Sequence, residues 1–187
     1  GHGLDLSGGT GAHLEVMAPG FPTLQWRATE VLGESPGRPT PLEVIDAFTA
    51  GVHANVEPAL PLDLSEPFGS WHPALRALEG RVRLALSCNV VHITPWAVAE
   101  GLFRGAGRLL SEGGVLALYG PFSEGGVFSS DGNRRFDAML RGQDPSWGIR
   151  DLDEVRELAR SCGLGLEARF AMPANNLLLG FGREGAG

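Results

Sequence analysis

Short apolar runs alternate with segments of helical periodicity along most of the chain. The apolar runs predict strands near residues 3–6, 24–29, 56–60, 83–91, 114–119, 164–171 and 176–182. The segments between them predict helices near residues 12–18, 41–50, 73–78, 96–110, 132–142 and 151–162. Because strands that alternate with helices form βαβ units, this order predicts an α/β domain whose mostly parallel sheet is covered on both faces.

Two stretches rich in proline and glycine, residues 33–41 and 120–132, interrupt this pattern and are predicted to be loops. The same alternation continues on both sides of each stretch, so neither is interpreted as a domain linker. A chain of 187 residues is long enough to bury one core. We therefore expect residues 1–187 to form a single domain.

Charge and cysteine content narrow the classes of partner. The formal net charge is -7, so no overall basic surface favours nucleic acid. Two cysteines provide neither a disulfide framework nor a set of zinc ligands, which favours a reducing, cytoplasmic compartment. No apolar run approaches the roughly 20 residues of a membrane-spanning helix. No pair of histidines or carboxylates has metal-ligand spacing on one helix face, so no metal site is predicted.

A glycine-rich turn follows the first predicted strand. Asp5 ends that strand, and Gly8, Gly9 and Gly11 precede the first predicted helix. Glycine lets the backbone approach a ligand closely, so this turn is a candidate cofactor loop, although a plain turn has the same composition. A dinucleotide fold would place its last glycine at position 14, which is Leu14 here. An NAD-linked enzyme is therefore the weaker alternative.

Two acidic residues follow the next two predicted strands. Glu30 ends the second strand, where a carboxylate can accept hydrogen bonds from both hydroxyls of a ribose. Asp63 follows the third strand, where it can reach an adenine amino group. A solvated strand-end carboxylate is the alternative for Glu30, and a loop cap is the alternative for Asp63.

Several blocks of sequence together resemble the DUF938 or methyltransferase-like protein 26 family, which consists of predicted S-adenosylmethionine-dependent methyltransferases. The resemblance spans almost the whole chain, and the later blocks are far more specific than the glycine turn. The matching blocks are Ser7–His13 (SGGTGAH), Trp26–Val31 (WRATEV), Ser87–Trp96 (SCNVVHITPW), Glu100–Ala106 (EGLFRGA), Leu118–Phe122 (LYGPF), Asp144–Asp151 (DPSWGIRD) and Met172–Asn176 (MPANN).

The resemblance implies a Rossmann-like class I methyltransferase fold with seven strands, the last of them antiparallel, and S-adenosylmethionine as cofactor. By position it places Asp5, Gly9 and Gly11 beside the methionine part of the cofactor. It likewise places Glu30 at the ribose and Asp63 at the adenine. It also places Asn89 and His92 after the fourth strand, next to the transferable methyl group.

This chain departs from the family pattern at several positions, among them Gly8, where Ser is more usual, and Ala28, where Pro is more usual. Family members usually carry a further stretch ahead of the first strand, so an amino-terminal segment is expected to be missing here. The acid common at the start of the fourth strand is Arg83 in this chain.

Three residues are candidates for catalysis. His92 can serve as a base because imidazole titrates near neutral pH, although a structural histidine is the more common case. Asn89 can orient a substrate amine or a cofactor group through its amide, with a buried strand-end asparagine that satisfies backbone groups as the alternative. Tyr119 ends the fifth predicted strand and can present its hydroxyl at the same rim, with core packing as the alternative.

The leading functional hypothesis is methyl transfer from S-adenosylmethionine to a small-molecule or protein acceptor. A protein that binds the cofactor, or serves as a scaffold, without turnover is the alternative from a different class. The sequence identifies neither the acceptor nor the oligomeric state.

Overall fold

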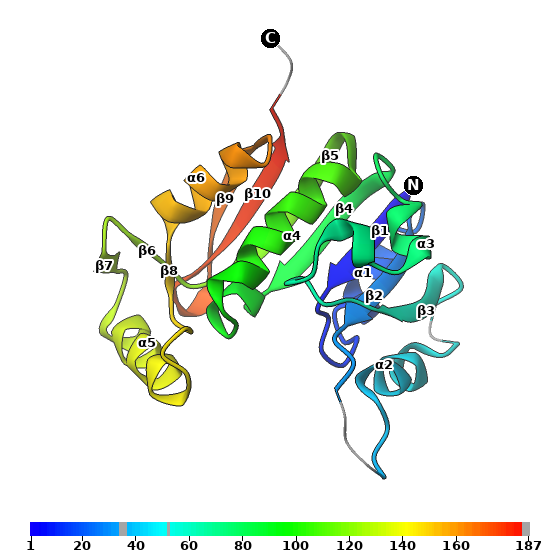
Figure 1. The fold of residues 1–187 in the computed structure, drawn as a ribbon, viewed down its shortest axis with the longest axis horizontal. Coiled ribbons are helices and arrows are strands. Elements are labelled where there is room, and N and C mark those ends of the chain that lie inside the picture. The colour runs from blue at the N-terminus through cyan, green and yellow to red at the C-terminus, as the bar shows by residue number, and fades with distance from the viewer. Residues whose placement is uncertain (34–36, 52, 185–187) are drawn as a thin grey trace.

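The computed structural model describes residues 1–33, 37–51 and 53–184, and its main feature is one seven-stranded sheet (Figure 1). In chain order the strands of this sheet are β1 (His2–Leu6), β2 (Gln25–Glu30), β3 (Val56–Pro61), β4 (Val82–Cys88), β5 (Leu110–Gly120), β9 (Leu164–Met172) and β10 (Asn176–Arg183). They lie side by side in the order β3-β2-β1-β4-β5-β10-β9. The first five are parallel, whereas β10 runs antiparallel to β5 and to β9. The predicted α/β fold with a mostly parallel sheet is confirmed.

Helices cover both faces of the sheet. α1 (Leu14–Gly20) and α2 (Pro41–Thr49) lie on one face, and α3 (Pro73–Arg76), α4 (Trp96–Leu109) and α6 (Leu152–Ser161) lie on the other. The remaining helix, α5 (Asp131–Gln143), is set apart from this sheet (Figure 1). The two faces of β1 contact two different hydrophobic clusters, because successive side chains of a strand point to opposite faces. Leu4 and Leu6 belong to the cluster with α4 and α6, whereas Gly3 faces Trp26 in the cluster with α1 and α2. In Figure 1, α4 crosses in front of β4 and β5.

Capping residues set where two of these helices begin. Thr40 Oγ1 accepts a hydrogen bond from the Glu43 backbone N–H at 3.3 Å, and Glu43 Oε2 accepts from the Thr40 N–H at 2.7 Å. This reciprocal pair satisfies two donors that the first turn of α2 leaves without helical partners. Asp151 caps α6 by accepting a hydrogen bond from the Asp153 N–H at 3.0 Å.

The fourth strand is shorter than its apolar run predicts. The expected strand at residues 83–91 ends at Cys88, because Asn89 adopts the left-handed conformation with φ 60°. Asparagine tolerates this conformation better than most residues. Val90 and Val91 are buried within the 3₁₀ helix η2 (Val90–His92), so their apolar character reflects burial in a turn of helix and not in a strand.

The predicted loop at residues 120–132 contains two short strands. β6 (Phe122–Glu124) pairs with β7 (Val127–Phe128) and with β8 (Arg150–Asp151) to form a second, three-stranded sheet. Asp151 Oδ2 accepts hydrogen bonds from Ser123 Oγ at 3.0 Å and from the Gly126 N–H at 2.8 Å. Strands this short are held by such contacts and show no hydrophobic period. In the other predicted loop, 33–41, residues 34–36 lie outside the described residues.

The strand order fixes where a ligand site is expected. From β1 the chain adds β2 and β3 on one side, then crosses to add β4 and β5 on the other side. In open α/β sheets, ligands bind at such a switch point, outside the carboxyl ends of the strands. Here the switch point lies between β1 and β4.

Within the described ranges, none of the helices has the length and apolarity needed to cross a bilayer.

Candidate cofactor site

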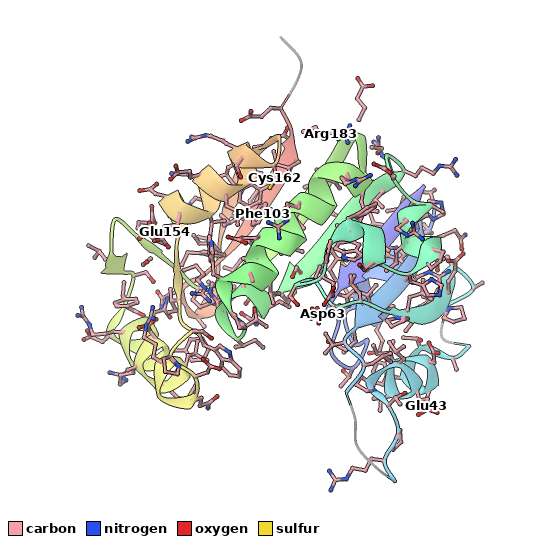
Figure 2. The ribbon with its side chains drawn as sticks, in the orientation of Figure 1. Glu43, Asp63, Phe103, Glu154, Cys162 and Arg183 are labelled. Atoms are coloured by element: carbon pink, nitrogen blue, oxygen red, sulfur yellow. The ribbon has the colours of Figure 1, made fainter. Side chains whose placement is uncertain are left out.

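A cavity of about 400 Å³ lies at the carboxyl ends of β1, β2 and β4, beside the start of α4. Asp63, which lines this cavity, is labelled in Figure 2. This volume is typical of small-molecule sites, and the cavity occupies the switch point of the sheet. The residues that line it are Ser7, Gly8, Gly9, His13, Glu30, Val31, Asp63, Leu64, Cys88, Asn89, Val90, Ile93, Thr94 and Val98.

The glycine-rich turn is fastened to the end of β2. The Gly8 N–H donates to the Thr29 carbonyl at 3.0 Å, and the Gly9 N–H donates to Glu30 Oε2 at 2.9 Å. Gly9 has φ +63°, and a Cβ added there would meet no atom within 4 Å, so this part of the turn leaves open space beside the backbone. Gly11, at φ +83°, is turned toward Ile45 of α2 instead and does not line the cavity. The loop therefore offers Gly9, and not Gly11, to a ligand.

Glu30 and Asp63 line the cavity, as the sequence predicts for a ribose and an adenine contact. Glu30 is half-buried, and its two carboxylate oxygens accept hydrogen bonds from the Gly9 and Val31 N–H groups, each at 2.9 Å. Asp63 Oδ1 accepts hydrogen bonds from the Ser65 N–H at 2.8 Å and from the Ser65 hydroxyl at 2.6 Å. Asp63 thus caps its own loop and also lines the cavity.

Asp5 is fully buried beneath the glycine turn and does not itself line the cavity. A Cβ at Gly8 would lie 2.4 Å from Asp5 Oδ2, so the turn closes over the carboxylate. Both oxygens face His13, whose Nδ1 lies 3.2 Å from Oδ1 and 3.1 Å from Oδ2. His13 does line the cavity, with its side chain 37 % exposed. Asp5 therefore acts on a ligand only through His13.

The pairing with Asp5 changes the charge of His13. The hydrogen bond to Asp5, followed by one to Cys88, raises the pKa of His13 to about 10, and partial burial offsets part of this rise. The imidazole is thus a cation at neutral pH and adds a positive group to the cavity wall. Neither His13 nor Cys88 was among the site residues expected from the sequence, although His13 begins the first predicted helix, where a polar contact to the cofactor is possible. Their positions at a strand end and at a helix start were the available signals.

Asn89 is the one residue of the proposed catalytic set that lines the cavity. Its backbone N–H donates to the Tyr119 carbonyl at 2.8 Å, which joins the end of β4 to the end of β5. The left-handed turn at Asn89 directs the chain from the strand into η2. The family resemblance placed this residue after the fourth strand, and its role toward a ligand stays a prediction.

His92 is fully buried and lies outside the cavity. Burial, together with the charge of Arg150, lowers the pKa of His92 to about 3, so the ring is neutral at physiological pH. The Arg150 backbone N–H lies 3.4 Å from Nδ1, whereas Nε2 has no hydrogen-bond partner in the described part of the chain. The titration near neutral pH on which the prediction of a base rested is therefore absent.

Tyr119 also lies away from the cavity. Its hydroxyl accepts a hydrogen bond from Asn176 Nδ2 at 2.9 Å. This bond ties β5 to β10, the adjacent antiparallel strand. Asn89, His92 and Tyr119 are thus neighbours at the ends of β4 and β5, yet only Asn89 contacts the cavity.

Arg150 fixes the segment that forms one wall of the cavity. Its guanidinium donates to the carbonyls of Val91 at 2.8 Å, Thr94 at 2.7 Å and Ser146 at 2.8 Å. It also lies over the Trp96 ring, 5.5 Å from the ring centroid. These contacts connect η2 and the start of α4 to the segment before β8, because one planar fork satisfies several carbonyls at once.

Comparison with protein families gives one match that spans nearly the whole chain. The model of a family described as "Protein of unknown function (DUF938)" matches residues 2–183.

Solved proteins, two of them described as O-methyltransferases, share the fold. The mitomycin 7-O-methyltransferase MmcR superposes with a TM-score of 0.76 at 16 % identity, covering 98 % of this chain and 49 % of its own. The O-methyltransferase NcsB1 from neocarzinostatin biosynthesis, solved with S-adenosylmethionine and 2-hydroxy-5-methyl naphthoic acid, gives 0.73 at 16 % identity, with coverage of 98 % and 49 %. LepI, solved with S-adenosylmethionine, gives 0.74 at 14 % identity, with coverage of 98 % and 43 %. This chain therefore spans about half the length of the solved proteins it matches.

Proposed function

This chain belongs to the DUF938 family, and we propose that it binds S-adenosylmethionine and transfers its methyl group to a small-molecule or protein acceptor. The observation that carries the proposal is the cavity at the switch point of the sheet, where Glu30 and Gly9 are joined by a hydrogen bond. Solved neighbours with the same fold bind S-adenosylmethionine, which supports the choice of cofactor.

The chemistry of the cavity wall fits this ligand. The Glu30 carboxylate is the acceptor for the two ribose hydroxyls, and its hydrogen bond to Gly9 keeps it in place. The imidazolium of His13 and the open backbone at Gly9 suit the charged amino-acid part. Leu64 and Asp63 suit the apolar face and the amino group of adenine. When bound, the cofactor supplies an electrophilic methyl group on a sulfonium.

The protein's contribution to methyl transfer is proximity and orientation, since an in-line displacement needs no nucleophile from the enzyme. In this proposal Asn89 orients the acceptor at the cavity, and His92 and Tyr119 support the ends of β4 and β5 behind it. Because the His92 ring is buried and neutral, the favoured acceptors are those that bring a free lone pair at neutral pH. The net charge of -7 disfavours nucleic acid as acceptor. A cytoplasmic location remains a prediction from the two cysteines.

One observation favours the alternative of cofactor binding without turnover. His92 and Tyr119 do not line the cavity, so Asn89 is the single member of the predicted catalytic set that a bound acceptor meets. A non-catalytic binding or scaffold protein requires only the cofactor contacts.

Thermal unfolding with added ligands tests the proposal. S-adenosylhomocysteine at about 100 times its Kd should stabilise the chain by about 2.7 kcal/mol, which raises Tm by roughly 5–10 °C in a domain of this size. NAD should leave Tm unchanged, because the buried Leu14 stands where a dinucleotide fold has glycine. A rise with NAD alone would contradict the proposal. Release of S-adenosylhomocysteine from S-adenosylmethionine is then measured with phenol, carboxylate, amine and protein acceptors. Release that depends on an acceptor identifies an enzyme, whereas binding without release identifies a non-catalytic binding protein.

A further inference from the structure

Cys88 and His13 line the same cavity although they are distant in the chain. Cys88 is the last residue of β4, and His13 directly precedes α1. β4 runs parallel beside β1, with Leu86 opposite Asp5, so the neighbouring strand ends bring the thiol close to the imidazole. Cys88 is partly exposed, and a small molecule in the cavity therefore has access to its sulfur.

Asp5 supplies the third part of this arrangement. Its fully buried carboxylate holds His13 Nδ1 at 3.1 and 3.2 Å from its two oxygens, on the side of the ring away from solvent. The pairing keeps His13 a cation at neutral pH. The positive charge of His13 and the partial exposure of Cys88 are the surroundings in which reactive cysteines are found. A nucleophile, an imidazole beside it and a carboxylate that orients the imidazole also form the arrangement typical of activated thiols.

We propose that Cys88 is a reactive-cysteine site, at which small, soft carbon electrophiles that enter the cavity form a thioether and thereby block ligand binding. This proposal goes beyond the proposed methyl transfer and does not depend on the identity of the cofactor. It rests on the position of Cys88, His13 and Asp5 around one cavity.

The step is a simple substitution. With iodoacetamide as the probe, the sulfur lone pair of Cys88 attacks the CH₂ carbon, a C–S bond forms and the C–I bond breaks. Iodide leaves with the bonding electrons, and the thiol proton passes to solvent. No oxidant or reductant takes part. The added carbamidomethyl group occupies part of the cavity that a ligand would need.

The second cysteine is an internal reference. Cys162 is also partly exposed and follows the last residue of α6, where it is labelled in Figure 2. Its sulfur lies 3.7 Å from the Ser161 hydroxyl, a neutral group. The two thiols therefore have comparable exposure and differ in the charge of the group beside them.

The test measures the alkylation rates of both cysteines in one sample at pH 7, by mass spectrometry of the digested chain after timed exposure to iodoacetamide. We expect Cys88 to react at least about 10-fold faster than Cys162, since cysteines in electropositive, partly exposed surroundings are the reactive ones. Rates for Cys88 that are equal to or below those of Cys162 overturn the proposal, and this comparison needs no variant.

Two substitutions then assign the cause. Asp5→Asn keeps the imidazole but removes the carboxylate charge, and His13→Gln removes the cation. Each should lower the Cys88 rate toward that of Cys162 and leave Cys162 unchanged, in chains whose cooperative unfolding shows that they are folded. An undiminished Cys88 rate in folded His13→Gln contradicts the proposed role of His13.

Protection by ligand separates this proposal from the proposed function. Saturating S-adenosylhomocysteine should slow Cys88 alkylation and leave Cys162 unaffected. If Cys88 is fast and unprotected while no binding is detected, the cofactor assignment fails and the reactive site stands. If the ligand binds yet Cys88 is still alkylated at the unliganded rate, the claim that the adduct and the ligand share the cavity is refuted.

Discussion

The two histidines at the ends of β1 and β4 show how a residue's surroundings decide its chemistry. His13 lies against a buried carboxylate and is held as a cation, whereas His92 is enclosed by apolar groups and by Arg150 and is held neutral. The Phe122 ring lies edge-on to His92 at 4.9 Å between centroids. The same side chain therefore serves as a charged cavity group at one strand end and as a packing group at the next.

Burial of His92 predicts a dependence of stability on pH. The pKa of His92 is about 3 in the folded chain, whereas an unfolded histidine titrates near 6.5. Between these values the unfolded state binds a proton that the folded state does not, so stability falls as the pH decreases below about 6.5. The slope for one proton approaches about 1.4 kcal/mol per pH unit.

Urea unfolding of the wild type and His92→Asn at pH 6.5 and pH 5 measures this effect. The variant should be less stable at both values and should lose less stability than the wild type between them. Equal losses would contradict the assignment of His92 as a buried neutral ring. The comparison stops at pH 5 because most carboxylates titrate below it.

The sequence could predict those site residues whose position depends on their own strand, and not those that depend on which strands are neighbours. Glu30 ends the second strand, and parallel strands bring their carboxyl ends to one edge, so its position was accessible to sequence reasoning. Asn89 lies inside a longer apolar run, and only the family resemblance placed it after the fourth strand. The grouping of Asp5, His13 and Cys88 depends on β4 lying next to β1, which no local pattern specifies. The burial of His92 likewise depends on packing against Phe122 of β6 and Arg150 of β8, whereas its position after the fourth strand suggested a base.

At the scale of elements, α4 is held close to the segment that follows β3. A Cβ at Gly101 would lie 1.6 Å from the Leu64 carbonyl oxygen, and one at Gly105 would lie 2.1 Å from the Trp71 ring. Backbone at Leu64 cannot move without disturbing the cavity wall that Leu64 and Asp63 provide. These helix glycines are explained by close packing and not by the need for an unusual backbone conformation.

This packing predicts opposite effects of the same substitution in two helices. Gly101→Ala should destabilise the chain by at least about 1–3 kcal/mol, because an added methyl group in a packed interface forces backbone shifts. Gly142→Ala in α5 is the matched control. No atom lies within 4 Å of a Cβ built at Gly142, so alanine there should be neutral or stabilise by up to about 1 kcal/mol.

Urea unfolding of both glycine variants measures these effects, and equal changes in the free energy of unfolding would contradict the packing of α4 on Leu64.

Elements with strong hydrophobic periods were predicted well, and irregular ones were not. The seven strands of the main sheet and the six α-helices were expected in order. The errors fell where side-chain contacts override pattern. Asn89 ends β4 in a left-handed turn, although the apolar run continues beyond it. Asp151 holds the short strand β6 and its turn in a stretch that was predicted to be a loop because of its glycines and proline.

At the scale of the whole molecule, the order of the strands determines where the candidate site lies. The crossover between the β1 and β4 halves creates the cavity, and the residues around it come from segments as distant as Ser7 and Val98. The same sheet superposes on methyltransferases roughly twice the length of this chain. The superposition covers the part that carries the cavity, and the proposed function requires that this chain bind the cofactor through Glu30.

Calorimetric titration of S-adenosylmethionine into the wild type, Glu30→Ala and the matched control Glu15→Ala tests that claim most directly. Glu30 lines the cavity, whereas Glu15 is an exposed residue of the first turn of α1. Loss of a charge-assisted hydrogen bond should weaken binding by about 1.5–3 kcal/mol, or roughly 10- to 100-fold in Kd, in Glu30→Ala alone. Equal affinities in all three folded chains, or no binding by the folded wild type, would contradict the proposed cofactor site at Glu30.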